Sequence, residues 1–116
     1  MKDIIMYINE NIWESSKEEI KDLTWKTLRY NSDKYESKLK ELNEYSKDKS
    51  KFTDNICKEF IEKILEFISK ENKNIKISIK KDYLEQYNLR TKEDKKEIKE
   101  AIISGIDRFI FDFRNK

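Results

Sequence analysis

Apolar residues recur at spacings of three and four along most of this chain, which is the pattern of helices that bury one face. The spacing predicts a first short helix over residues 2–13. A second helix should begin at Ser15 or Ser16, because a glutamate follows each serine three residues later and completes a capping box. The predicted buried face of this second helix is Ile20, Leu23 and Leu28.

The apolar register lapses at residues 31–33, and we interpret the segments before and after it as two helices rather than one continuous rod. Asp33, with Glu36 three residues later, can cap the third helix. The predicted inward side chains of this helix are Tyr35, Leu39, Leu42 and Tyr45. Residues 46–51 carry only polar side chains and are interpreted as a linker.

The most strongly patterned segment follows Phe52 and Thr53, which can supply a hydrophobic staple and an N-cap. A stripe of this width can contact two neighbouring helices, so we expect this helix at the centre of the fold, ending near residues 72–74. The residues of the stripe are Ile56, Cys57, Phe60, Ile61, Ile64, Leu65, Phe67 and Ile68.

Residues 75–80 alternate strictly between apolar and polar, with isoleucine at every second position. The pattern predicts a short strand whose wet face carries Lys76, Ser78 and Lys80. A short helix over residues 81–88 should follow. A lone strand would leave backbone polar groups unpaired, so it needs a partner in this chain or in a second copy. Residues 108–113, with a phenylalanine at every second position, are either a returning strand or the end of the last helix.

The last helix should begin at Thr91, an N-cap residue with Asp94 three positions later. Its apolar residues are Ile98, Ala101, Ile102, Ile106, Phe109, Ile110 and Phe113. The expected fold class is therefore mainly α, with five to six helices and one short β-strand or a two-stranded ribbon. We expect a single domain over residues 1–116, with N-terminal helices in 1–50 and a central helix plus a strand-helix-helix segment in 51–116.

The composition supports one thin core. The chain has 116 residues, of which 43% are charged and 36% are hydrophobic, so each apolar residue must be used on an inward face. The net charge is only +2, but residues 73–99 hold nine basic and five acidic side chains, a local net charge of +4. One cysteine and no apolar run of about 20 residues favour a cytoplasmic protein without a membrane span.

Much catalytic chemistry is excluded by composition. There is no histidine, which removes the commonest general base and the usual partner of serine and cysteine nucleophiles. The only cysteine, Cys57, lies on an apolar stripe, and the only glycine, Gly105, rules out glycine-rich phosphate loops. Glu59, Glu62 and Glu66 fall on an outer helix face among lysines, where surface salt bridges are the ordinary interpretation. We expect a protein that is not an enzyme and has no metal and no cofactor.

The order helix, strand, short helix, capped helix resembles, in layout only, two kinds of DNA-binding module: the winged helix-turn-helix and the ribbon-helix-helix protein. This layout and the local positive charge predict a small nucleic-acid-binding regulator of a bacterial or mobile-element system, acting as a homodimer. Acidic residues alternate with the lysines of the last helix, and they would repel phosphate. The expected contact residues are Lys76, Ser78, Lys80, Lys81, Arg90, Lys92, Lys95, Lys96 and Lys99.

A different class of function also fits the sequence. A small helical protein of this kind can act as a protein–protein inhibitor, for example an antitoxin, an immunity protein or a phage-encoded anti-defence protein. Aromatic side chains outside the main apolar stripes are the type that anchors such interfaces. The candidates for partner binding are Trp13, Trp25, Tyr30 and Tyr87.

Overall fold

The computed structural model describes residues 17–71 and 87–115, and for residues 68–71 the backbone only. These residues form five α-helices and one 3₁₀ turn, so the mainly helical fold class is confirmed. The elements are α2 (Lys17–Tyr30), α3 (Ser32–Glu36), α4 (Leu39–Lys47), η2 (Lys49–Lys51), α5 (Asp54–Glu71) and α7 (Lys92–Arg114). The predicted helix over residues 2–13 and the predicted strand over 75–80 lie outside the described residues.

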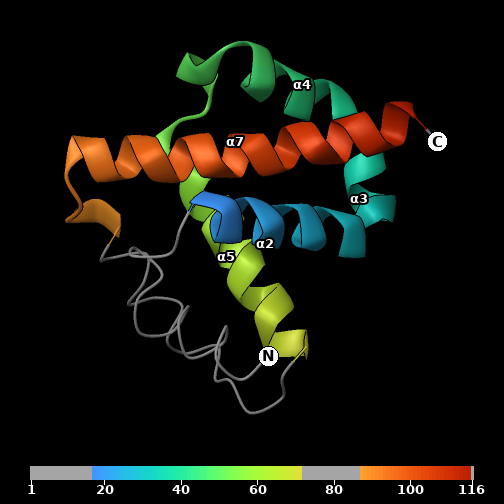
Figure 1. Ribbon diagram of the computed structural model, residues 1–116, viewed down its shortest axis with the longest axis horizontal. Coiled ribbons are helices and arrows are strands. Elements are labelled where there is room, and N and C mark those ends of the chain that lie inside the picture. Colours follow the sequence, from blue (N-terminus) through green and yellow to red (C-terminus); the bar gives the residue numbers. More distant parts are fainter. Residues whose placement is uncertain (1–16, 72–86, 116) are drawn as a thin grey trace.

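The longest helix, α7, lies between α2 and α4, and α5 crosses the pair α2 and α7 (Figure 1). Helix α2 runs parallel to α7: Lys17, the first residue of α2, pairs with Glu100 of α7, and Trp25, further along α2, bonds to Asp112, further along α7. Helix α4 runs antiparallel to α7. Helix α5 contacts both α2 and α7, as its wide stripe predicts, but the helix with the most extensive packing is α7, against α2 and α4, and not α5.

The contact between α2 and α7 is close because of one residue. At Gly105 a Cβ atom would lie 2.6 Å from the backbone oxygen of Lys21 and 2.6 Å from Cβ of Thr24. Thr24 and Thr27 are buried in this region, and their hydroxyls donate to the carbonyl oxygens of Ile20 and Leu23 within α2. The buried polar atoms are thus satisfied inside their own helix, which leaves only methyl groups facing outward.

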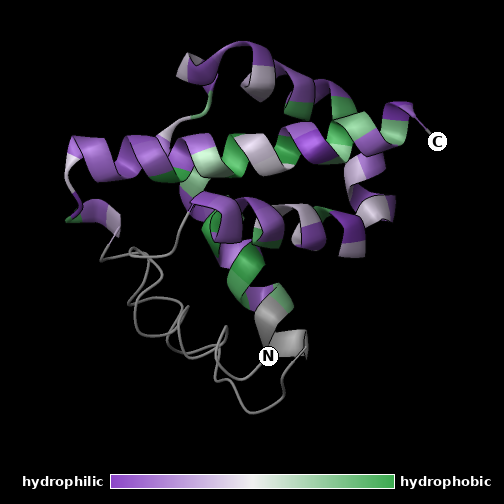
Figure 2. Ribbon diagram, viewed as in Figure 1, coloured by the Kyte–Doolittle hydropathy of each residue, from purple (hydrophilic) through white to green (hydrophobic). Residues whose placement is uncertain are grey.

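The buried residues form one contiguous cluster to which every long helix contributes. In its aromatic part, Phe60 of α5 stacks on Tyr35 of α3 at 6.5 Å between ring centroids and lies 5.7 Å from Phe52, the residue that follows η2. Rings at these separations contribute about 0.5–1.5 kcal/mol beyond the area they bury. The apolar faces predicted for α2, α5 and α7 point inward, and Figure 2 shows hydrophobic residues along the later turns of α7.

The C-terminal residues are helical. Helix α7 continues to Arg114, so the strand interpretation of residues 108–113 is wrong. Phe109 and Ile110 continue the buried face that Ile106 begins, whereas Phe111 is 65% exposed. Burying two adjacent residues and exposing the next suits a helix and not a strand, in which Phe109 and Phe111 would share a face. No strand occurs in residues 17–71 or 87–115, and a winged helix would need one at 108–113.

The predicted third helix is divided. Helix α3 ends at Glu36 and α4 begins at Leu39, and Tyr35 and Leu42 are buried on either side of this break. Asp33 does not cap α3: the N-cap position is Asn31, whose side chain makes no capping bond. The segment interpreted as a linker is also more ordered than expected, because α4 extends to Lys47 and the η2 turn follows it.

Two predicted N-caps are present. The hydroxyl of Thr91 accepts a hydrogen bond from the backbone N–H of Asp94 at 3.1 Å and starts α7. Thr53 accepts from Ile56 at 3.4 Å at the start of α5, a longer and weaker bond. Within the described ranges, no helix is long and apolar enough to cross a membrane.

Candidate nucleic-acid interface

The first turns of α7, the η2 turn and the start of α5 enclose a groove of about 510 Å³. We call it the basic groove because five of its nine lining residues are lysines, against two acids. The lining residues are Lys49, Ser50, Asp54, Lys92, Lys95, Lys96, Lys99, Glu100 and Ile103. The four lysines that the sequence assigns to the last helix thus share one site, and Lys49 joins them from a part of the chain more than forty residues earlier.

Helix geometry separates these lysines from the acids that alternate with them in sequence. Residues four and seven positions apart lie on the same side of a helix, so Lys92, Lys96 and Lys99 face the groove together. Glu93 and Glu97 do not line it. Figure 2 shows the first turns of α7 as hydrophilic, and of the charged residues in 92–99 only the lysines line the groove. The repulsion expected from the sequence is therefore smaller than the alternation suggests.

The lysines of the groove differ in what they contact. Among the described residues, Lys49, Lys92 and Lys96 have no ion-pair partner, and all three are exposed. Lys95 lies 5.4 Å above the ring of Tyr87 in a cation–π contact. Lys99 is paired, with its Nζ atom 2.6 Å from Oδ1 of Asp54. Three cationic groups in the groove are thus left for an anion from solvent.

The groove connects to the interior through Asp54. Its Oδ1 atom also accepts a hydrogen bond from the Tyr87 hydroxyl at 3.1 Å. The hydrogen bond from Lys99 and the one from Tyr87 hold the pKa of the Asp54 carboxyl below its usual value. Tyr87 is fully buried, and burial, together with neighbouring Cys57 and Asp54, raises its pKa. Burial raises the pKa of the Cys57 thiol to about 12, so Cys57 is a core residue, as the sequence predicts.

The other residues predicted to contact nucleic acid are placed only in part. Arg90 lies just before α7, with its Nε atom 3.8 Å from Oδ2 of Asp94, and does not line the groove. Lys76, Ser78, Lys80 and Lys81 lie outside the described residues. Sequence reasoning missed Lys49, Ser50 and Asp54. The signal for Lys49 and Ser50 was the polar run 46–51, which was interpreted as a linker and carries two groove residues.

The aromatic residues predicted to bind a partner have different environments. Tyr30 is 55% exposed and contacts the edge of Phe67. Trp25 is half-buried: its indole N–H donates to Asp112 at 2.7 Å, and the guanidinium of Arg108 lies 3.8 Å from its ring centroid. Tyr87 is in the core, so its ring is not presented at the surface. Trp13 lies outside the described residues.

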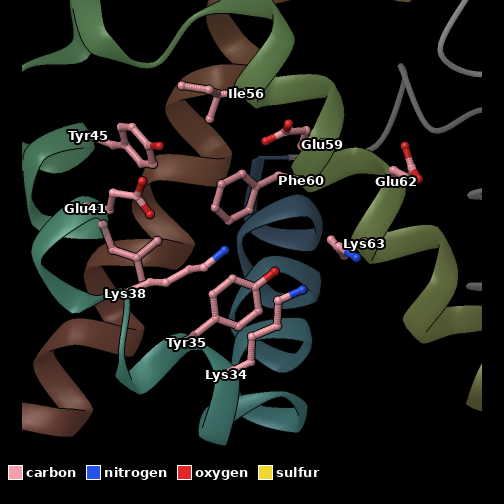
Figure 3. A pocket seen from close by; sticks show the side chains of 11 residues that line it. Lys34, Tyr35, Lys38, Glu41, Tyr45, Ile56, Glu59, Phe60, Glu62 and Lys63 are labelled. Carbon is pink, nitrogen blue, oxygen red and sulfur yellow. The ribbon is translucent and has the colours of Figure 1, made fainter.

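A second concave site lies between α4 and α5, with a volume of about 440 Å³ (Figure 3). Its centre is aromatic, formed by Tyr35, Tyr45 and Phe60. Three lysines and three glutamates surround these rings: Lys34, Lys38, Lys63, Glu41, Glu59 and Glu62. The charge of Lys63 is the main reason that the pKa of Lys34 is lowered. We call this site the α4–α5 pocket; it is balanced in charge, unlike the basic groove.

Neither concave site has an arrangement suited to metal binding, since the described residues contain no group of three or more cysteine or carboxylate side chains that could hold a metal ion. Lys63 and Glu66 form the type of surface ion pair that the sequence predicts for this helix, at 3.5 Å. Comparison with known proteins adds no relative: no family model, no curated protein and no solved structure matches the chain.

Proposed function

We propose that this protein is a non-catalytic regulator that binds the phosphate backbone of nucleic acid in the basic groove. The observation that carries the proposal is the convergence of Lys49, Lys92 and Lys96, without acidic partners among the described residues, on one groove of about 510 Å³. Lysines that neutralise phosphates release condensed counterions, and this release supplies most of the affinity of sequence-independent binding.

The chemistry of the groove favours contact with phosphates over reading of bases. Its cations are all lysines, which act as point charges and lack the planar fork that arginine offers to a guanine edge. The described residues that line the groove include no aromatic side chain, and Tyr87, whose ring Lys95 contacts, is buried. Within residues 17–71 and 87–115, the groove therefore has no exposed ring on which a base could stack. Binding in this groove should depend weakly on sequence and strongly on salt.

The test is binding of a fluorescent DNA duplex over a range of salt concentrations. Contacts from about four lysines should give a log–log slope of about −3.6 and a loss of affinity on the order of 10² between about 50 mM and about 200 mM salt. Replacing Lys92 and Lys96 together by alanine should make the slope shallower by about 1.8. The matched control replaces Lys38 and Lys40, which are exposed and lie outside the groove. Absence of binding at low salt, or equal effects of the two pairs, would refute the proposal.

The α4–α5 pocket favours a second candidate function, recognition of a protein partner. Its aromatic centre with a mixed-charge rim has the composition of an interface anchor site, and exposed Tyr30 lies on the neighbouring helix α2. Capture of a partner from the native host should then be weakened by replacing Tyr30 and Tyr45 with alanine and unchanged by replacing Lys92 and Lys96. The opposite pattern supports the basic groove.

A further inference from the structure

Two acids line the basic groove, and one of them, Asp54, is held in place by contacts with groove and core residues. Asp54 is in the first turn of α5, where the helix dipole favours a negative charge, and it contacts both Lys99 at 2.6 Å and the Tyr87 hydroxyl at 3.1 Å. The other acid of the groove, Glu100, is directed to Lys17 of α2, 3.4 Å away. Asp54 is thus the carboxylate that directly neutralises a groove lysine.

We infer that Asp54 is a built-in competitor of phosphate that occupies Lys99 in the unbound groove and limits the affinity of the groove for nucleic acid. This inference rests on the proposed function. A bound phosphate would take the place of the Asp54 carboxylate at Lys99, while the hydrogen bond from Tyr87 keeps the carboxylate in the groove. When the wild-type protein binds a phosphate, it therefore loses the ion pair between Lys99 and Asp54, and the negative charge of Asp54 remains beside the bound phosphate.

A phosphate can displace Asp54 from Lys99 only if this ion pair is accessible to solvent. The side chains of Lys99 and Asp54 are 28% and 49% exposed, so a phosphate can reach the ammonium group from solvent. Ion pairs at this exposure are individually weak, and a buried pair would resist displacement much more strongly. The contact from Tyr87 is different, because its hydroxyl comes from a fully buried residue and is not displaced by the ligand.

The experiment compares Asp54→Asn with Asp33→Asn in the duplex-binding assay. Both variants remove one negative charge, but Asp33 is exposed on α3 and does not line the groove. Asp54→Asn should bind about two- to fivefold more tightly than the control at low salt. Its log–log salt slope should stay close to that of the control, because Lys99 contacts phosphate in both proteins and Asp54→Asn removes only the competing carboxylate. Adding Lys99→Ala to Asp54→Asn should cancel the gain.

A measurement on the wild-type protein does not depend on the folding of any variant. Addition of the duplex should raise the pKa of the Asp54 carboxyl, read by carbon NMR, because the hydrogen bond from Lys99 is lost and a phosphate approaches. Asp54→Ser provides a second variant without the carboxylate. Equal affinity of Asp54→Asn and Asp33→Asn for the duplex, or an unchanged Asp54 pKa on binding, would overturn the inference while the proposed function stands. If the wild-type protein does not bind the duplex at all, both fail.

Discussion

Gly105 of α7 and Thr24 of α2 mark a close contact between these two helices. The helices can approach this closely because glycine has no Cβ atom: a Cβ at Gly105 would lie 2.6 Å from the backbone oxygen of Lys21 in α2. The obstacle is the backbone oxygen and the Cβ of a β-branched residue, and neither can move without shifting the helix. The glycine is therefore a packing residue.

Gly105→Ala should destabilise the protein although alanine is the better helix former. Alanine gains about 1 kcal/mol over glycine in helix propensity. Overpacking costs about 1–3 kcal/mol, and here the added Cβ would clash with the backbone oxygen of Lys21, which is not free to move like a side chain. We expect a net loss of about 1 kcal/mol in the free energy of unfolding, measured by urea denaturation. The neighbouring Ser104→Ala should change stability by less than about 0.5 kcal/mol. Equal stability of the two variants would show that α2 can move away at no cost.

At the scale of elements, short-range rules predict two of the three helix starts that the structure tests, because Asp33 does not cap α3. The caps at Thr53 and Thr91 depend on residues three positions away, and both are present. The break between α3 and α4 has no comparable signal, because its position depends on Tyr35 and Leu42 packing into the same core from two directions. The helical conformation of residues 108–113 likewise depends on which of their side chains the core buries.

The two caps should differ in strength. Thr91→Ala should lower the free energy of unfolding by about 1 kcal/mol, because the bond to the Asp94 N–H is of normal length. Thr53→Ala should cost less, because its bond to the Ile56 N–H is 3.4 Å long. Urea denaturation of both variants tests this order, with Thr91→Ser as the control that keeps the hydroxyl. A larger loss at Thr53 would contradict it.

At the scale of the whole molecule, the interior holds groups that must stay neutral. Cys57 is fully buried, and its pKa in the folded protein is about 12, against an ordinary value of 9.0. A raised folded-state pKa means that the corresponding stability is fully present below pH 9.0 and is lost as the pH rises toward 12. Tyr87, beside it, has the same sign of shift.

The global stability of the protein should therefore fall on the alkaline side. Between about pH 8 and about pH 10, wild type should lose about 1 kcal/mol more in the free energy of unfolding than Cys57→Ala, which has no thiol to ionise. The comparison uses the change with pH and not the absolute stability, because the alanine variant also loses packing. Urea denaturation at each pH measures it. Parallel curves for the two proteins would show that folding does not raise the pKa of the Cys57 thiol.

The sequence by itself determined the helical class, the apolar faces of α2, α5 and α7, and the caps at Thr53 and Thr91. These features depend on a repeat of 3.6 residues and on hydrogen bonds spanning three residues, both of which can be read locally. The sequence also identified Lys92, Lys95, Lys96 and Lys99 as a group. It did so from local charge, without knowing which acids share their face.

Only the tertiary structure decided that α7 is the central helix, that residues 108–113 are helical and that Lys49 and Asp54 join the lysines of α7 in one groove. Each of these depends on contacts between residues far apart in the chain, and no local pattern encodes such distances. Asp54 is the clearest case. In sequence it is the first residue of a helix, and the fold places it beside Lys99 and Tyr87, more than thirty residues away from either.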